Sequence, residues 1–181
     1  AEVARALCEA RADMNKASRD GSTPLRIAAK TGFSDGVALL CELRADVARA
    51  MPLDGATAMH LAASRGCPVM LRALCAARAD VEATQRNGNT PLCLAALHGK
   101  AEAAAALYEA RADLNRSGVA PPVTGSLAMQ GATPMFLAAQ HGFVDVVRFL
   151  CEARADARKA TAIGVSPLAA AVLQGHDDAA L

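Results

Sequence analysis

The residues best suited to metal binding or nucleophilic catalysis in this chain are its six cysteines and four histidines. Cys93 and His98 are five residues apart, which is not a spacing that metal-binding motifs use. His60, His98 and His141 form no pattern with a serine or cysteine and an acid that would pair a nucleophile with a base. The sequence therefore predicts no metal site, no cofactor and no catalytic residue.

The spacing of these residues indicates a repeat instead. One equivalent position in five segments is held by Cys8, Cys41, Cys75, Tyr108 and Cys151. Glutamate recurs two residues before an arginine, at Glu9, Glu42, Glu109 and Glu152. Because such charges alternate in sign, we interpret them as a surface ion-pair network of modest stability.

Two longer phrases recur with the same period. The phrase Ala-Arg-Ala-Asp, with Leu replacing its first Ala once, ends at Asp13, Asp46, Asp80, Asp113 and Asp156, which are 33, 34, 33 and 43 residues apart. The phrase Gly-x-Thr-Pro-Leu, with small variations, begins at Gly21, Gly55, Gly88, Gly131 and Gly164. A further glycine follows at 32, 66, 99, 142 and 175.

A period of 33 with Thr-Pro-Leu and Ala-Ala resembles the ankyrin repeat. The segment from Gly55 to Gly66 matches the family pattern Gly-x-Thr-Pro-Leu-His-x-Ala-Ala-x-x-Gly closely, and the resemblance covers nearly the whole chain. It implies an all-α solenoid of stacked antiparallel helix pairs with finger-like hairpin loops. It also implies that His60 bonds to backbone or threonine groups between repeats. By the same resemblance Asn15 and Asn115 stabilise turns, and such asparagines are hydroxylated in some members.

Elementary helix chemistry agrees with this fold. A Thr before Pro caps a helix whose first residue needs no N–H partner, so we expect a helix from Pro24 to Thr31, ended by Gly32. The second helix of a unit is expected from Val144 to Ala153, with Val146, Val147, Leu150 and Cys151 on one apolar face. One such unit cannot bury its apolar face alone, whereas a stack can.

Two features depart from the family pattern. Ala58 replaces the proline of the second copy, which costs little at the first helical position. Arginine replaces the usual glycine before Ala-Asp in all five copies. If those arginines adopt left-handed backbone conformations, each costs on the order of 1 kcal/mol relative to glycine.

We divide the single domain, residues 1–181, into seven segments: a partial repeat at 1–15, full repeats at 16–48, 49–82 and 83–115, an insertion loop at 116–127, a full repeat at 128–158, and a truncated repeat at 159–181. The partial repeats lead us to expect a segment of a longer chain. The insertion is rich in Gly, Pro and Ser, which predicts a projecting loop across which the stack continues. We expect its removal, from Gly118 to Leu127, to preserve helicity but to weaken partner binding.

Composition limits the function. The net charge of +1 and the absence of a basic run argue against nucleic-acid binding, and no apolar stretch is long enough to span a membrane. No secretory leader is visible, and equivalent cysteines in stacked repeats would lie ~10 Å apart, too far for a disulfide. We therefore expect six reduced thiols in an intracellular, cytoplasmic monomer.

The resemblance implies a protein-binding scaffold that uses the finger tips and the inner helices on its concave side. The matching positions are Arg19, Asp20, Ser22, Lys30, Thr31, Leu53, Asp54, Ala56, Ser64, Arg65, Arg86, Asn87, Asn89, Leu97, His98, Met129, Gln130, Ala132, Gln140 and His141. Leu53, Met129 and Ile163 are apolar at fingertip positions, which favours contact with a partner protein. Two alternatives stay open: the segment is the substrate-targeting arm of an enzyme whose catalytic domain lies outside it, or it is a structural spacer.

Overall fold

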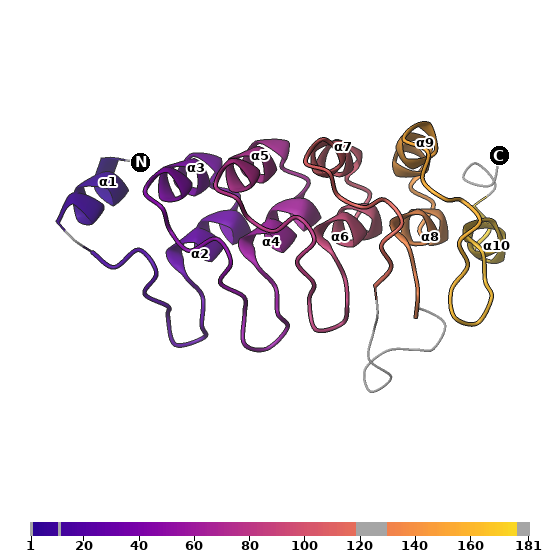
Figure 1. Ribbon diagram of the computed structural model, residues 1–181, viewed down its shortest axis with the longest axis horizontal. Helices are drawn as coiled ribbons and strands as arrows, with labels where there is room; N and C mark the ends of the chain where they lie inside the picture. Colours follow the sequence, from indigo (N-terminus) through magenta and orange to yellow (C-terminus); the bar gives the residue numbers. More distant parts are fainter. Residues whose placement is uncertain (1, 11, 119–129, 177–181) are drawn as a thin grey trace.

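The chain forms a row of short helices with finger-shaped loops along one side (Figure 1). The computed structural model describes residues 2–10, 12–118 and 130–176, and these residues contain ten helices and no strand. The prediction of an all-α solenoid with finger loops is therefore confirmed.

The helices lie in two layers. The inner layer contains the first helix of each unit: α2 (Pro24–Thr31), α4 (Ala58–Arg65), α6 (Pro91–Leu97), α8 (Pro134–Gln140) and α10 (Pro167–Leu173). The outer layer contains α3 (Ser34–Glu42), α5 (Pro68–Ala76), α7 (Ala101–Glu109) and α9 (Val144–Glu152). Each inner helix from α2 to α8 packs on its outer partner, and both layers pack on their neighbours along the row. Helix α1 (Glu2–Glu9) precedes α3 at the N-terminal end, where Arg5 lies 3.8 Å from Glu42.

Helix α2 begins and ends where the sequence predicts. The hydroxyl of Thr23 accepts the backbone N–H of Arg26 at 3.3 Å, and Pro24 occupies the first helical position of α2. Gly32, at φ 84°, ends that helix in the left-handed conformation. The predicted range from Pro24 to Thr31 is thus confirmed. Thr90, Thr133 and Ser166 cap α6, α8 and α10 in the same way.

The outer helices are followed by arginines in the left-handed conformation. The backbone φ angles of Arg44, Arg78, Arg111 and Arg154 lie between 61° and 71°. Ala45 N–H then donates to Leu40 O at 2.9 Å, which closes the helix end. The substituted arginines therefore occupy a conformation that favours glycine, and Arg11 lies outside the described residues.

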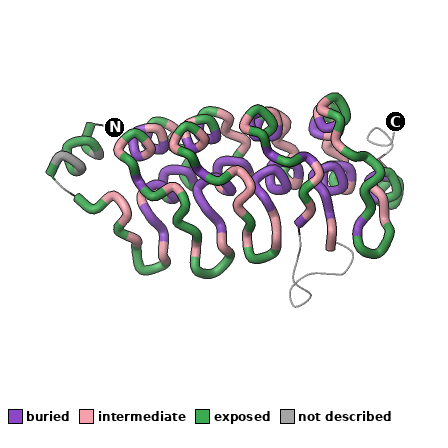
Figure 2. Tube along the Cα trace, viewed as in Figure 1, coloured by how far each residue is buried: buried purple, intermediate pink, exposed green. Residues whose placement is uncertain are grey.

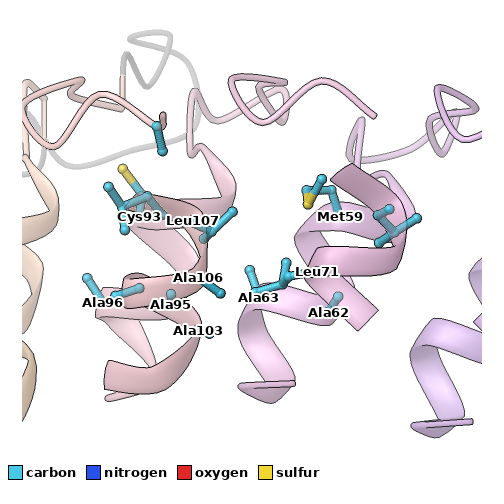
Figure 3. Packing of buried hydrophobic residues seen from close by; sticks show 14 of the residues in the cluster. Met59, Ala62, Ala63, Leu71, Cys93, Ala95, Ala96, Ala103, Ala106 and Leu107 are labelled. Carbon is cyan, nitrogen blue, oxygen red and sulfur yellow. The ribbon is translucent and has the colours of Figure 1, made fainter. Parts of the chain in front are cut away.

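Small side chains hold the layers together. Figure 3 shows Ala62 and Ala63 of α4 beside Leu71 of α5, and Ala103 and Leu107 of α7 near Ala95 and Cys93 of α6. All of these residues are fully buried. Figure 2 shows that burial concentrates in the inner helices and the facing sides of the outer helices, while the finger tips are exposed. The buried core of the described residues consists largely of alanine and leucine.

The insertion interrupts one finger without breaking the stack. Gly118 N–H donates to Ala132 O at 3.1 Å, and Gly131 N–H donates to Gly118 O at 3.2 Å. Ser18 makes the same pair with Ser22 and Gly21. Gly21 follows Ser18 by three positions and Gly131 follows Gly118 by thirteen, so the ten extra residues of this finger fall between Gly118 and Gly131. Helix α8 packs on α6 across this point, and residues 119–129 lie outside the described part.

Candidate functional site

The fingers are hairpins closed by paired backbone hydrogen bonds. In the first finger, Ser18 N–H donates to Ser22 O and Gly21 N–H donates to Ser18 O, both at 2.9 Å. Gly21 has a φ of 85°, which a residue with a side chain rarely adopts. Arg19 and Asp20 therefore stand at an exposed tip on a fixed base. We call the surface formed by the fingers and by α2, α4, α6, α8 and α10 the finger face.

Hydrogen bonds between neighbouring fingers keep the tips in a row. Arg86 N–H donates to Asp54 O at 2.8 Å, which joins the second finger to the third. Ala162 N–H donates to Gln130 O at 2.8 Å, which joins the fourth finger to the fifth. Because backbone groups make these contacts, the tip side chains remain available for a partner.

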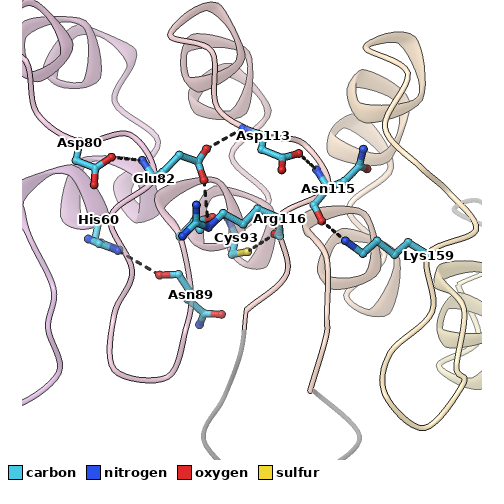
Figure 4. A network of polar contacts seen from close by, with 10 residues as sticks. His60, Asp80, Glu82, Asn89, Cys93, Asp113, Asn115, Arg116 and Lys159 are labelled. Carbon is cyan, nitrogen blue, oxygen red and sulfur yellow. Dashed lines mark hydrogen bonds and ion pairs between the residues drawn. The ribbon is translucent and has the colours of Figure 1, made fainter.

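His60 links two repeats through both ring nitrogens. Its Nδ1 lies 2.9 Å from Thr57 Oγ1 and 3.2 Å from Thr57 N, and its Nε2 lies 3.2 Å from Asn89 O in the next finger (Figure 4). The contacts expected from the family resemblance are confirmed. Burial lowers the pKa of His60 below its ordinary value of 6.5, while the backbone near Asn89 and Ala83 opposes that shift.

Acid should therefore weaken the fold through His60. As pH falls below about 6.5 the unfolded chain binds a proton that the folded chain resists, so stability is present above that pH and is lost below it. The slope for one such proton is at most about 1.4 kcal/mol per pH unit. Urea unfolding at pH 7.5 and 5.5 should show a smaller loss in His60→Gln than in the wild type. Equal losses in the two proteins would contradict this role.

A polar ladder joins the loops that follow the outer helices (Figure 4). Asn15 Oδ1 accepts Asp46 N–H at 2.8 Å, and Asn115 Oδ1 accepts Asp156 N–H at 2.7 Å. Glu82 takes the same position in the third copy and accepts Asp113 N–H at 2.7 Å. The asparagine side chains thus connect neighbouring units. The turn within each unit is closed instead by Asp13 or Asp113, which accepts the backbone N–H of Asn15 or Asn115.

Most of the predicted contact positions lie on the finger face and are at least partly exposed. These are Arg19, Asp20, Lys30, Thr31, Leu53, Asp54, Ser64, Arg65, Arg86, Asn87, Asn89, Leu97, His98, Gln130, Gln140 and His141. Leu53 is 80% exposed and Ile163 is 53% exposed, so two of the three apolar fingertips reach solvent. The third, Met129, lies outside the described residues.

Three predicted contact residues are buried instead. Ser22, Ala56 and Ala132 directly follow the finger glycines and lie inside the hairpin base. Ser22 is held there by Asp20, which accepts its N–H at 3.1 Å and its hydroxyl at 2.9 Å. These side chains support the fingers and do not form contact surface. Sequence position alone could not show this, because the residue after a turn glycine can point either way.

Charge is distributed unevenly along the finger face. The first three units place four cations on it: Arg19, Lys30, Arg65 and Arg86. The acids beside them serve the fingers, since Asp20 accepts bonds from Ser18 and Ser22 and Asp54 accepts Ala56 N–H at 2.9 Å. Hydrogen bonds from Ser18 and Ser22 lower the pKa of Asp20 to about 2. In the last two units the exposed or partly exposed positions named above are Gln130, Gln140, His141 and Ile163, none of which is an acid, a lysine or an arginine.

A pocket of about 200 Å³ lies on the finger face between α8 and α10. Its lining contains Phe136, Gln140, Ile163, Val165, Ala170, Leu173 and Gln174. Phe136 forms a buried wall, while Leu173 is 74% exposed at the rim. Gln140 and Ile163 could be named as contact residues from the sequence, but the pocket could not, because side chains of two successive units must meet to form it.

Arg26 is a second feature that sequence analysis missed. It is buried at the position that His60 and Cys93 hold in the next two copies. Burial lowers the pKa of its guanidinium, and the charges of Asp54 and Asp20 oppose that shift. Its Nε has no hydrogen-bond partner, and one terminal nitrogen lies 3.5 Å from Ser22 Oγ. A cation buried between the first two fingers adds to the positive character of this end.

The comparison with known families agrees with this geometry. A family model described as ankyrin repeats (3 copies) matches residues 47–118 and 120–181, well over half of the chain. The chain belongs to the ankyrin repeat family. Ankyrin repeats are in general protein–protein interaction modules and are typically not catalytic. No curated protein matches the chain in a sequence search.

The cysteines of this ankyrin repeat protein are free thiols wherever they are described. Cys41, Cys67, Cys75, Cys93 and Cys151 are unpaired, and burial beside Glu42 raises the pKa of Cys41 to about 11. Cys151 was expected to be buried but is exposed. Cys41 and residues of α5 in the next unit line one shared pocket, whereas no outer helix follows α9 among the described residues. The side chain of Cys8 lies outside them.

The predicted ion-pair network is wrong. Within residues 2–10, 12–118 and 130–176 the ion pairs are Arg5–Glu42, Arg116–Glu82 and Arg148–Asp145. None involves the four left-handed arginines, because residues two apart do not face each other and neighbouring units stand ~10 Å apart. The described residues also contain no cluster of three metal-binding side chains, and none of their helices is long and apolar enough to cross a membrane.

Proposed function

We propose that this ankyrin repeat domain is a scaffold that binds another protein through its finger face. The support is a contrast between two sets of positions. Cap threonines, turn glycines and core alanines recur from copy to copy and are used in folding. The exposed positions of the finger face vary more from copy to copy: the residue before the helix-ending glycine, for example, is Thr31, Arg65, His98 or His141. Leu53, exposed at a tip, has no structural use in the described residues.

The domain acts as a monomer in this proposal and requires no cofactor. The rival function, a substrate-targeting arm of an enzyme, would use the same surface. A catalytic domain encoded in the same reading frame would favour it.

A capture experiment with matched surface variants tests the proposal. Purified domain is the bait, and retained proteins are quantified for the wild type, for Leu53→Glu with Arg86→Glu on the finger face, and for Val69→Glu with Arg72→Glu on the outer helix α5. All four side chains are exposed, so both double variants should keep the wild-type helical signal. We expect at least one protein to be retained by the wild type and the α5 variant but reduced about tenfold by the finger variant. Retention that is equal in all three, or absent, would refute the proposed function.

A further inference from the structure

The pocket between α8 and α10 has the size and lining of a site for one apolar side chain. Its volume is about 200 Å³, roughly that of six or seven water molecules in the liquid. Pockets for drug-sized ligands usually occupy about 300–1,000 Å³, and a helix is about 10 Å across. A single large side chain of an extended peptide therefore fits it better than a small-molecule ligand or a helix.

The chemistry of the lining excludes a charged occupant. Phe136, Ile163 and Leu173 present hydrocarbon to the cavity, and no ionisable group lines it. A charge placed there would lose its hydration without gaining a counter-charge. An aliphatic or aromatic side chain would instead remove the exposed surface of Ile163 and Leu173 from water.

Two carboxamide side chains at the pocket can form hydrogen bonds with a peptide backbone. Gln140 and Gln174 both line it, and Oε1 of Gln140 is buried without a hydrogen-bond partner. Leaving a buried acceptor unpaired is unfavourable, so a rotation of the Gln140 carboxamide that brings Oε1 to a backbone N–H of an entering chain would be favoured. Carboxamides both donate and accept, so they suit the alternating N–H and C=O groups of an extended segment.

Exposed arginines on the same face indicate that the ligand also carries acidic residues. Arg65 of α4 and Arg86 of the third finger are exposed, and neither forms an ion pair among the described residues. Arg65 makes one hydrogen bond, 2.7 Å to the backbone oxygen of Lys30, which holds its guanidinium at the end of α2. Asp54 of the neighbouring finger accepts Ala56 N–H in its own turn and forms no ion pair with either arginine. Carboxylates of a partner could form charge-assisted hydrogen bonds with these two arginines.

We propose that the finger face binds an extended acidic peptide segment, one large apolar side chain of which enters the pocket between α8 and α10. This inference rests on the proposed function and adds the chemistry of the partner. Units stand ~10 Å apart and an extended chain advances about 3.3 Å per residue. The acids that reach Arg86 and Arg65 are thus about five to eight residues from the apolar anchor.

Selection from a random library of peptides about 12 residues long, displayed on phage, tests this with the whole chain as bait. Enriched peptides should carry Asp or Glu together with Leu, Ile, Met or Phe at about that separation. The best one is then synthesised with a fluorescent label and titrated by anisotropy. Leu173→Glu should weaken binding about tenfold or more, as should Arg65→Glu with Arg86→Glu. Val172→Glu, on the same helix but outside the pocket, should change affinity less than about twofold. High salt should weaken wild-type binding more than that of the double arginine variant.

The outcomes separate this inference from the proposed function. Enrichment of basic or uncharged peptides would overturn it, as would equal effects of Leu173→Glu and Val172→Glu. Loss of binding in the arginine variant alone would refute the pocket but keep the finger face. A library that yields no binder would overturn the peptide ligand, while a folded partner sensitive to Leu53→Glu would still support the scaffold. Binding that no finger-face variant alters would refute both proposals.

Discussion

Replacing the four left-handed arginines with glycine is expected to raise the free energy of unfolding by about 4 kcal/mol in total. Their φ angles of 61° to 71° place side chains in a region where an L-residue costs on the order of 1 kcal/mol relative to glycine. None of them is in an ion pair of the described residues, so little is lost with the side chains. The four positions are Arg44, Arg78, Arg111 and Arg154.

Two controls test this prediction: whether the effects of the four substitutions add, and whether glycine at a helical arginine has the opposite effect. The four sites are one unit apart, ~10 Å, so their effects should add within a few tenths of a kcal/mol. Arg72→Gly is the matched control, because Arg72 is an exposed arginine inside helix α5. Glycine there should lower stability by about 1 kcal/mol. Urea unfolding followed by circular dichroism measures both changes. A loss of stability in the fourfold variant would show that these arginines make contacts worth more than their strain.

The sequence predicted the parts of the fold that rest on local chemistry. Thr23, Pro24 and Gly32 each act on the backbone within a few residues, so α2 could be bounded correctly in advance. His60 could be assigned by resemblance, because its partners recur at fixed positions in every finger. The left-handed backbone of Arg78 was predictable for the same reason, since the family places glycine there.

Features that depend on the meeting of two units could not be predicted. The pocket needs Phe136 from one unit and Leu173 from the next, and neither residue is unusual at its own position. The burial of Arg26 depends on its surroundings between two fingers. The exposure of Cys151 depends on which helix follows α9. A repeat pattern specifies positions within a unit, whereas these properties are set by the particular side chains of its neighbour.

Leu71→Ala is expected to lower the free energy of unfolding by about 3 kcal/mol, within the range of 2–5 kcal/mol for leucine truncation in a core. Leu71 is fully buried in α5, where the alanines of α4 lie on one side and neighbouring outer helices on the other. Surroundings of alanine have few long side chains that could collapse into a cavity, so the void should persist. The measured loss should therefore lie toward the upper half of that range.

Because Leu71 lies near the middle of the stack, Leu71→Ala also tests whether the repeats unfold independently. Each unit contacts only its neighbours, so stability is a sum of unit terms and interface terms. A weakened interface at α5 should uncouple the first two units from the rest, and hydrogen exchange should then show faster opening in α2 to α5 than in α6 to α9. Leu168→Ala provides the matched control, because Leu168 of α10 is 56% exposed and its truncation should cost less than about 0.5 kcal/mol. Uniformly faster exchange across all helices of Leu71→Ala would mean that the stack unfolds as one cooperative body, and the nearest-neighbour description would then fail for this protein.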